Sequence, residues 1–151
     1  MNYIKDLRKI VGHKTLLMPS VAALIYQQDK LLLQRRVDNK KWALHGGAIE
    51  LDEKVEEALK REVYEETNLY LDEYKLFKIY SGKDMHLIYP NGDEVSLISL
   101  IYMSSSFHGE MKEQKEEVLE LKWFHFEEIK DLDLHEVDKK VIYDFIEYMK
   151  K

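Results

Sequence analysis

Residues 47–69 read GAIELDEKVEEALKREVYEETNL, a glutamate-rich stretch with the apolar spacing of an amphipathic helix. Asp52 is a residue type that favours the N-cap position, just before the first turn of a helix. Glu53 and Glu56 would then lie in the first turn, where the positive end of the helix dipole stabilises carboxylates. The sequence therefore predicts a helix that begins near Asp52, and its first acids need no further explanation.

The second half of this predicted helix places acids where its apolar stripe should continue. The stripe begins with Val55, Ala58 and Leu59. At about 3.6 residues per turn, the positions seven residues further on share the same face, and they are Glu62, Glu65 and Glu66. Burying a carboxylate without a positive partner is costly. A divalent metal ion is a suitable partner, and a solvated helix end is the alternative that the spacing leaves open.

Length and composition predict one domain over residues 1–151. Of the 151 residues, 45% are hydrophobic, which is enough for one sizeable core. We expect an N-terminal helix and turn over residues 1–14 and an amphipathic C-terminal helix over residues 136–151. No run approaches the ~18 apolar residues of a membrane span, and the first residues lack the apolar core of a signal peptide. We therefore expect a cytoplasmic protein with no membrane partner.

The charged and reactive residues narrow the possible chemistry. The chain has no cysteine, which excludes disulfides, zinc–thiolate sites, iron–sulfur clusters and cysteine nucleophiles. Its formal net charge is -6, whereas proteins that bind nucleic-acid polymers usually present a basic face, so we expect no such partner. A small anionic ligand is compatible with this charge if a cation bridges it to the acids.

Apolar runs on both sides of the acidic helix predict strands. Those before it cover residues 21–26, 31–35 and 42–44, and the last leads into a glycine pair. Those after it cover residues 76–80, 85–89, 95–103 and 119–126. Strands dominate, with one helix in mid-chain and another at the end. The rule of packed layers therefore favours a mixed sheet covered by helices on both faces.

The fixed positions of the acidic stretch resemble the Nudix box. They are Gly47, Glu53, Arg61, Glu62, Glu65, Glu66 and Leu69. The match is direct over these 23 residues, and the surrounding order of strands and helices also looks like that family. The resemblance implies an α/β fold, a Nudix-type α/β/α sandwich with a mixed β-sheet. It also implies a Mg²⁺-dependent hydrolase, with Mn²⁺ as a possible substitute, that cleaves the diphosphate linkage of a nucleoside diphosphate derivative.

The resemblance assigns roles to the residues of the box. The metal ligands would be Glu62, Glu65 and Glu66, with a backbone carbonyl of the glycine loop, expected at Gly47. Glu62 and Glu65 would also be catalytic, supported by Arg61 and Glu53. In the family these last two hold the loop and the helix together, and a surface ion pair is the alternative for each.

Other residues near the box are candidates for contact with substrate. Gly46 permits close approach of the backbone to a phosphate. Arg35 and Arg36 end a strand that leads to the glycine loop, so one of them, for which we take Arg35, would reach a phosphate, with a solvent-facing arginine as the alternative. His45 stands where the family often has proline, and it would either contact a phosphate or be an inert replacement. Asp52 and Asn68 stand where the family often has glycine, and both residue types tolerate a left-handed backbone.

The general base is open between a box glutamate and a glutamate in a later loop. The loop candidates are Glu113, Glu116, Glu117 and Glu120, with Glu117 preferred over the other three and a solvated acidic loop as the alternative for each. Two further groups of residues have ordinary structural explanations. The remaining histidines, His13, His86, His108, His125 and His135, are expected at the surface or half-buried. The strand aromatics Trp42, Tyr80, Tyr89 and Phe107 are expected in the core rather than stacked on a base.

Two functions from different classes follow. The first is a pyrophosphohydrolase for a nucleoside triphosphate, a nucleotide sugar or a similar small molecule. The alternative is a Nudix-fold module that binds a nucleotide for recognition or regulation with little turnover. Turnover would require the full set of acids, which a binding module does not need. Both a monomer and a homodimer fit the sequence.

Overall fold

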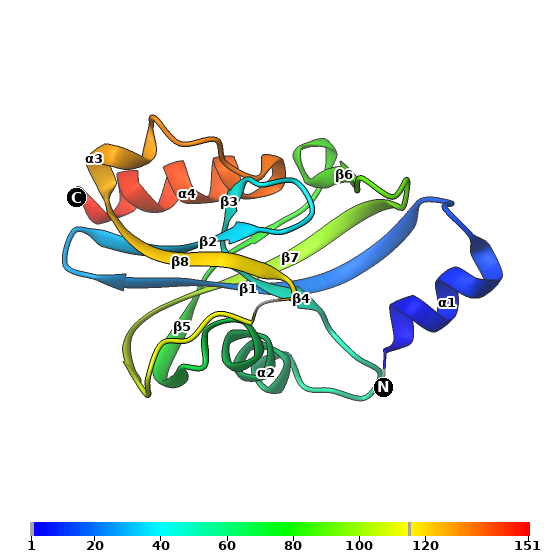
Figure 1. The fold of residues 1–151 in the computed structure, drawn as a ribbon, viewed down its shortest axis with the longest axis horizontal. Helices are drawn as coiled ribbons and strands as arrows, with labels where there is room; N and C mark the ends of the chain where they lie inside the picture. The colour runs from blue at the N-terminus through cyan, green and yellow to red at the C-terminus, as the bar shows by residue number, and fades with distance from the viewer. Residues whose placement is uncertain (1, 115) are drawn as a thin grey trace.

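The computed structural model describes residues 2–114 and 116–151, which form a mixed β-sheet between helices (Figure 1). In chain order the elements are α1 (Tyr3–Val11), β1 (Leu16–Gln27), β2 (Lys30–Arg36), β3 (Trp42–Ala43), β4 (His45–Ala48), α2 (Val55–Thr67), β5 (Tyr70–Tyr80), the 3-10 turn η1 (Lys83–Met85), β6 (His86–Ile88), β7 (Glu94–His108), β8 (Val118–His125), α3 (Phe126–Ile129) and α4 (Glu136–Met149).

Two long strands form the centre of the sheet. Strand β1 runs parallel to β7, in register from the pair Leu16 and Val95 to the pair Ile25 and Ser104. All other named pairings are antiparallel, with β4 on β1, β5 and β6 on β7, and β3 and β8 on β2. The predicted strands are present, and several extend further than their apolar runs, because ladder hydrogen bonds continue beyond the buried side chains.

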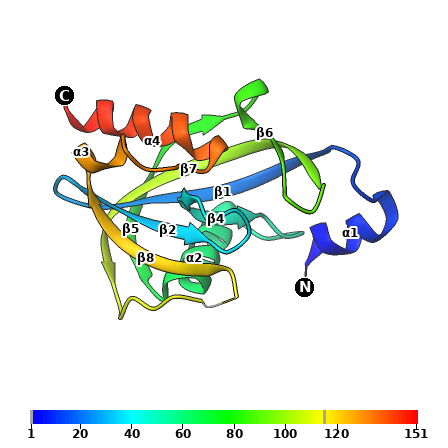
Figure 2. The ribbon, with the colours of Figure 1, turned by 45° about the horizontal axis from the view of Figure 1, so that its top comes forward.

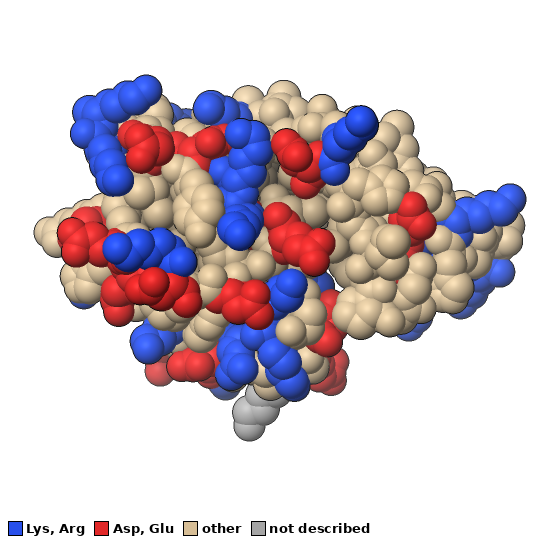
Figure 3. Space-filling view, turned by 90° about the horizontal axis from the view of Figure 1, so that it is seen from above, with Lys and Arg blue, Asp and Glu red and all other residues tan. Residues whose placement is uncertain are grey.

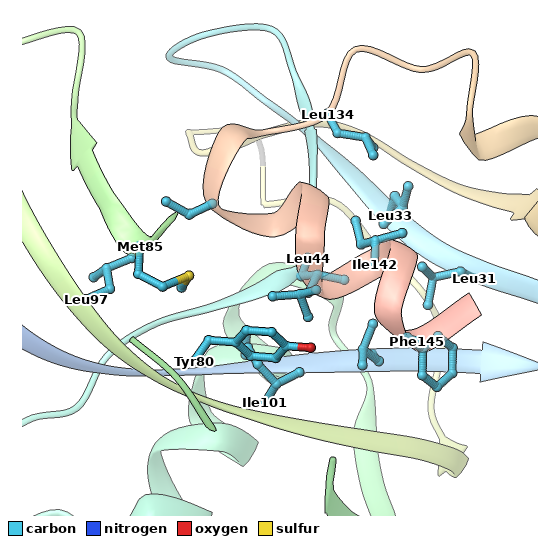
Figure 4. Close-up of a cluster of buried hydrophobic side chains, with 14 of the residues drawn as sticks. Leu31, Leu33, Leu44, Tyr80, Met85, Leu97, Ile101, Leu134, Ile142 and Phe145 are labelled. Atoms are coloured by element: carbon cyan, nitrogen blue, oxygen red, sulfur yellow. The ribbon is translucent and has the colours of Figure 1, made fainter. Parts of the chain in front are cut away.

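Helices cover both faces of the sheet, as Figures 1 and 2 show. Helix α4 packs on one face over a core that includes Leu31, Ile142 and Phe145, drawn in Figure 4. Helix α2 packs on the other face over a second core that includes Leu59 and Val63. The predicted α/β/α arrangement with a mixed sheet is therefore confirmed, with each buried strand face matched by the apolar side of one helix.

Helix α2 begins later than the sequence predicts. Its first residue is Val55 and its N-cap is Lys54, whose backbone N–H donates to Glu57 Oε1 at 2.9 Å. Asp52 instead lies in the preceding turn with a left-handed backbone, φ 62°. Asn68 ends the helix in the same conformation, φ 66°, as expected from its tolerance of that region.

The glycine pair lies in a strand rather than in a turn. Gly46 of β4 pairs with Ala22 of β1, and Gly47 pairs with Val21. A Cβ built on Gly46 would lie 2.0 Å from the backbone oxygen of Val21, so only glycine fits at this position. This close approach holds β4 against β1, while Gly47 faces Glu62 of α2 at the site described below.

Helix α1 lies at the end of the molecule opposite the C-terminus, with its first turn near the loop that leads into α2 (Figures 1 and 2). On the face above α4, positive and negative side chains are interspersed (Figure 3). Of the helices in the described part of the chain, none combines the length and the apolar character that a membrane crossing needs.

Candidate active site

Strand β4 and helix α2 meet through the carboxylate of Glu66. Its Oε1 accepts hydrogen bonds from the backbone N–H of Gly46 at 2.8 Å and from Gln34 Nε2 at 2.7 Å. Glu66 is only 6% exposed. Among the described residues, its other oxygen has no hydrogen-bond donor. The carboxylate is therefore held by one oxygen and keeps the second for another partner.

Gly47 gives Glu62 the room it needs. A Cβ on Gly47 would lie 2.6 Å from Glu62 Oε1, so a side chain at this position would collide with the carboxylate. Glu62 Oε1 accepts from Arg61 Nη1 at 2.8 Å, and its Oε2 has no hydrogen-bond donor among the described residues. The backbone of β4 and two box carboxylates thus come together at one place.

Arg61 links the loop between β4 and α2 to helix α2. Its Nε and Nη2 donate to the two oxygens of Glu53 at 2.7 and 2.9 Å, and Nη2 also donates to the backbone oxygen of Ala48 at 3.1 Å. This two-pronged geometry is the one that guanidinium and carboxylate groups favour. Pairing with Arg61 lowers the pKa of Glu53. The Arg61 and Glu53 pair therefore has the loop-to-helix position that the resemblance implies.

Glu65 lies outside the buried stripe, which corrects the expected continuation of that stripe. Its side chain is 47% exposed and lies 3.5 Å from Arg61 Nη1. Val63 and Thr67 carry the buried face of α2 onward, with Glu62 and Glu66 at its border toward β4. The reason is that the helical period exceeds 3.5, so a stripe drifts around the helix over seven residues.

These groups line a pocket of about 530 Å³. Its carboxylates are Asp38, Glu50, Glu62, Glu65, Glu66, Glu116 and Glu117, and its guanidinium groups are Arg36 and Arg61. The wall also includes Gly46, Gly47, Gln34 and Tyr89. The pocket is therefore strongly acidic, and an anionic substrate would need a cation between itself and this wall.

Burial and mutual repulsion raise the proton affinity of two of these acids. Burial raises the pKa of Glu62 to about 6, against the lowering effect of Arg61. Burial and the charge of Glu62 raise the pKa of Glu66 well above its ordinary value. Two carboxylates that are buried together with too little positive charge form a suitable donor set for a hard divalent cation.

The side chains are not already arranged as a finished metal site. Within residues 2–114 and 116–151, no three acidic or histidine side chains converge closely enough to hold an ion. The contacts explain this, because Arg61 draws Glu62 and Glu65 toward itself. The residues fit a metal through their remaining oxygens, provided that Glu65 turns away from Arg61.

His45 does not reach the pocket, so the expected phosphate contact is wrong in this structure. The side chain is fully buried, with Nε2 hydrogen-bonded to the backbone oxygen of Leu32 at 3.0 Å and Nδ1 3.1 Å from Gln34 Nε2. Burial lowers the pKa of His45 to about 4, so the ring is neutral and donates through Nε2. His45 instead helps to hold Gln34, which in turn holds Glu66.

Arg36 rather than Arg35 faces the pocket. Arg35 donates to the backbone oxygen of Lys40 at 3.0 Å and is exposed on the other face of β2. Arg36 lines the pocket and forms a two-pronged pair with Asp38 at 2.8 and 2.7 Å. Successive side chains of a strand point to opposite faces, so a one-residue difference decides which arginine faces the site.

Two of the four loop glutamates reach the pocket. Glu116 and Glu117 line it, whereas Glu113 and Glu120 are absent from its wall. The charge of Glu117 contributes to the raised pKa of both Glu62 and Glu66, so its carboxylate lies near theirs. Glu50 also lines the pocket and accepts from the backbone N–H of Tyr3 at 2.8 Å.

A second pocket of about 100 Å³ adjoins the first on the α4 side and contains polar groups that the sequence did not single out. Ser20 and Ser99 are hydrogen-bonded to each other at 3.0 Å, and Asp138 Oδ2 accepts from the backbone N–H of Leu44 at 2.9 Å. His135 is also in its wall and is 5% exposed, so the expected surface or half-buried position is wrong for this residue. In the sequence, Asp138 directly follows Val137 of the apolar stripe of α4, and this acid was the signal that could have indicated a polar group facing inward.

Comparison with known proteins places this geometry in a family. The family model described as NUDIX domain matches residues 16–145. A MutT-like protein of Streptomyces ambofaciens is 44% identical over 64 residues, 42% of each chain. A protein of Methanocaldococcus jannaschii named ADP-ribose pyrophosphatase is 35% identical over 113 residues, 72% of this chain and 62% of that one. The chain thus spans less than two thirds of these two relatives.

A third relative matches over nearly its full length. The protein of Escherichia coli O139:H28 named nucleoside triphosphatase NudI is 31% identical over 131 residues, 81% of this chain and 92% of that one. Among solved structures, a MutT protein from Bacillus halodurans has a TM-score of 0.71 at 26% identity, covering 86% of this chain and 82% of that one. The matched range contains the sheet, α2 and the residues that line the pocket apart from Asn2, and the chain belongs to the NUDIX domain family.

Proposed function

We propose that this chain is a metal-dependent hydrolase that cleaves the phosphoanhydride bond of a nucleoside diphosphate derivative. The observation that carries the proposal is the acidic pocket in which Glu62 and Glu66 of α2 meet the glycines of β4. The relatives named ADP-ribose pyrophosphatase and nucleoside triphosphatase support the same bond type. Diphosphates bring negative charge to an acidic wall, which makes a bridging cation necessary.

The residues that would hold a divalent cation are Glu62, Glu65 and Glu66, with the backbone carbonyl of Gly47. Glu62 and Glu66 each offer an oxygen without a hydrogen-bond donor among the described residues, and both are held by groups on the opposite oxygen. Bound there, Mg²⁺ or Mn²⁺ supplies neutralisation of phosphate charge and a more acidic water. Arg61 and Glu53 keep the loop and helix in place around it.

Glu117 is our candidate for the general base. It lines the pocket on a turn rather than on α2, so it is not part of the proposed ligand set. Its negative charge acts on both buried box glutamates, which supports a position beside the proposed metal site. The role is to accept the proton of the attacking water while the anhydride bond breaks.

The second pocket supports a nucleoside as the organic group. Its wall combines the apolar side chains of Met18, Leu44 and Leu97 with the polar groups of Asp138 and the serine pair. An apolar slot with a few fixed polar groups suits a planar base that carries hydrogen-bonding edges. It opens onto the glycine strand, because Gly46 and Gly47 line both pockets.

A hydrolysis assay tests the proposal. Nucleoside triphosphates, ADP-ribose, nucleotide sugars and dinucleoside polyphosphates are incubated with Mg²⁺, Mn²⁺ or a chelator, and nucleoside monophosphate release is measured. Metal-dependent release that falls strongly in Glu65→Gln and not in Glu56→Gln supports the proposal, because both side chains are exposed on α2 and only Glu65 lines the pocket. Nucleotide-induced thermal stabilisation without turnover would favour the binding module instead.

A further inference from the structure

Helix α1 precedes the residues that match the family, yet it forms a wall of a third cavity beside the proposed active site. The matched range begins at residue 16, and α1 ends at Val11. The cavity has a volume of about 570 Å³. Its wall is formed by Asn2, Ile4 and Arg8 of the α1 segment, by the hairpin of residues 89–95 and by Met18, Asp38, Ala48 and Glu117. We call this cavity the α1 lobe.

The α1 wall is fixed at both ends. At its start, the backbone N–H of Tyr3 donates to Glu50 Oε1, and Asn2 caps the helix by accepting from the N–H of Lys5 at 3.0 Å. Near its end, Arg8 Nη2 donates to the backbone oxygen of Glu94 at 2.7 Å, and Nη1 donates to that of Gly12 at 2.9 Å. Helix α1 is therefore a fixed wall of the cavity, and its first turn is attached to the loop between β4 and α2.

The α1 lobe and the two pockets described above are parts of one cavity system. Ala48 and Tyr89 line all three cavities. Asp38 and Glu117 line both the acidic pocket and the α1 lobe. A substrate with its diphosphate in the acidic pocket and its base in the α4-side pocket would thus extend its other end into the α1 lobe.

The chemistry of the α1 lobe disfavours a further phosphate. Among the described residues that line it, Arg8 is the single cationic side chain. Its Nη atoms donate to backbone carbonyls, and its buried Nε, which has no hydrogen-bond partner among these residues, lies 3.7 Å from Asp93. Glu117 adds a further negative charge, and Asp38 adds a carboxylate that is paired with Arg36. Without a second cation a terminal phosphate would be repelled here, whereas a hydroxyl group can donate a hydrogen bond to a carboxylate directly.

The same lobe has an apolar side that suits the carbon face of a sugar ring. Ile4, Met18 and Val95 contribute to the wall, together with the ring of Tyr89. We propose that the α1 lobe binds a neutral, hydroxyl-bearing group, a sugar, attached to the far phosphate of the diphosphate. This rests on the proposed function for the position of the diphosphate, and it selects nucleoside diphosphate sugars over nucleoside triphosphates.

Binding of analogues that resist cleavage tests this inference apart from turnover. The α,β-methylene analogues of ADP-ribose, UDP-glucose and GDP-mannose are titrated with Mg²⁺, each against the matching diphosphate and triphosphate analogues. We expect at least one sugar-bearing analogue to bind about 10-fold or more tightly than both of its partners. Ile4→Trp should abolish this preference by filling the lobe, whereas Ile10→Trp, on the same helix at a side chain that is 83% exposed, should preserve it.

A second variant guards against damage to α1. Asn91→Trp fills the lobe from the exposed turn on the opposite wall and should reduce the sugar preference by a similar factor. The inference would be overturned if, for every base, the sugar-bearing, diphosphate and triphosphate analogues bound with equal affinity. It would also be overturned if neither Ile4→Trp nor Asn91→Trp changed the preference for the sugar-bearing analogue. Sugar-dependent binding without hydrolysis of any natural compound would instead overturn the proposed function and leave the lobe assignment in place.

Discussion

The backbone N–H of Gly46 donates to Glu66 Oε1 at 2.8 Å, so a strand of the central sheet and the acidic helix are joined through a buried carboxylate. Gln34 of β2 donates to the same oxygen. The joint fixes Glu66 by one oxygen in a place where burial and the charge of Glu62 both oppose ionisation. The carboxylate of Glu66 is thus held in a defined position at a cost in folding stability. Substitution of Glu66 can separate these two effects.

Glu66→Gln should stabilise the metal-free protein and inactivate it. Glutamine can accept the same two hydrogen bonds without the buried charge. Because the pKa of Glu66 is raised in the folded state, its ionisation lowers stability as the pH rises above the ordinary glutamate value. In chelator at pH 7 to 8 we expect a gain of about 1 kcal/mol or more, or a Tm higher by about 2–4 °C. Thermal unfolding with chelator measures this.

The same variant should lose its response to metal. Mg²⁺ or Mn²⁺ should raise the Tm of the unmodified protein and leave that of Glu66→Gln nearly unchanged, with turnover reduced by about 100-fold or more. Glu56→Gln, on the exposed side of α2, is the control for loss of one acid from this helix. A variant that is less stable in chelator would show that Glu66 is paired in some other way.

The two adjacent glycines should respond differently to a methyl group. At Gly47 the added Cβ meets the Glu62 carboxylate at 2.6 Å, and that side chain can move aside. At Gly46 it meets backbone of β1 at 2.0 Å. Gly47→Ala should therefore keep its fold and lose about 10- to 100-fold in kcat/KM, since a displaced ligand misplaces the reacting groups.

Gly46→Ala should instead lower stability, by about 2 kcal/mol or more, because strands β1 and β4 must separate. Chemical denaturation of both variants beside their kinetics distinguishes the two effects. Equal losses of stability in both would mean that Glu62 is too tightly held by Arg61 to yield.

The helix and sheet positions were predictable from sequence because their signals are periodic. The apolar runs and the acidic stretch indicate strands, helix and box, which the structure contains. The start of α2 was misplaced because Asp52 suits both an N-cap and a left-handed turn, and only the turn occurs here. Local propensity does not distinguish these two uses.

Side-chain direction was the part that sequence could not supply. Whether Arg35 or Arg36 faces the pocket depends on the register of β2, and β2 has an irregularity at these residues in its pairing with β8. His45 was a substrate candidate from its position beside the glycines, but the pairing of β4 with β1 turns it into the interior. The contributions of α1 and Asp138 to cavity walls depend on packing between segments far apart in the chain.

His45 should make the protein less stable in mild acid. Its pKa is lowered to about 4 by burial, whereas an unfolded histidine has a pKa of 6.5. Between these values the unfolded state binds the extra proton. The contribution of His45 to stability is therefore fully present above pH 6.5 and is lost as the pH drops from about 6.5 to about 4. The total effect is about 3 kcal/mol.

The raised pKa values of Glu62 and Glu66 act in the opposite direction, so the effect of His45 must be read from a difference. His45→Gln keeps a donor and an acceptor without titrating. The free energy of unfolding of the unmodified protein, minus that of the variant, should decrease by about 3 kcal/mol on going from pH 7 to pH 4 in chelator. A difference that is constant with pH would show that the ring is not buried as a neutral group.

Glu117→Gln should slow the chemical step and leave metal binding intact. Glu117 lines the acidic pocket from a turn and is outside the proposed ligand set, so its loss should lower kcat by about 10²- to 10⁴-fold, the range for a general base. Glu113→Gln is the matched control, because Glu113 lies in the same acidic segment, is exposed and does not line the pocket. Single-turnover rates and the Mg²⁺-induced rise in Tm are measured for both. A normal rate in Glu117→Gln would assign the base to a box glutamate, whereas a lost thermal response to Mg²⁺ would make Glu117 a metal ligand.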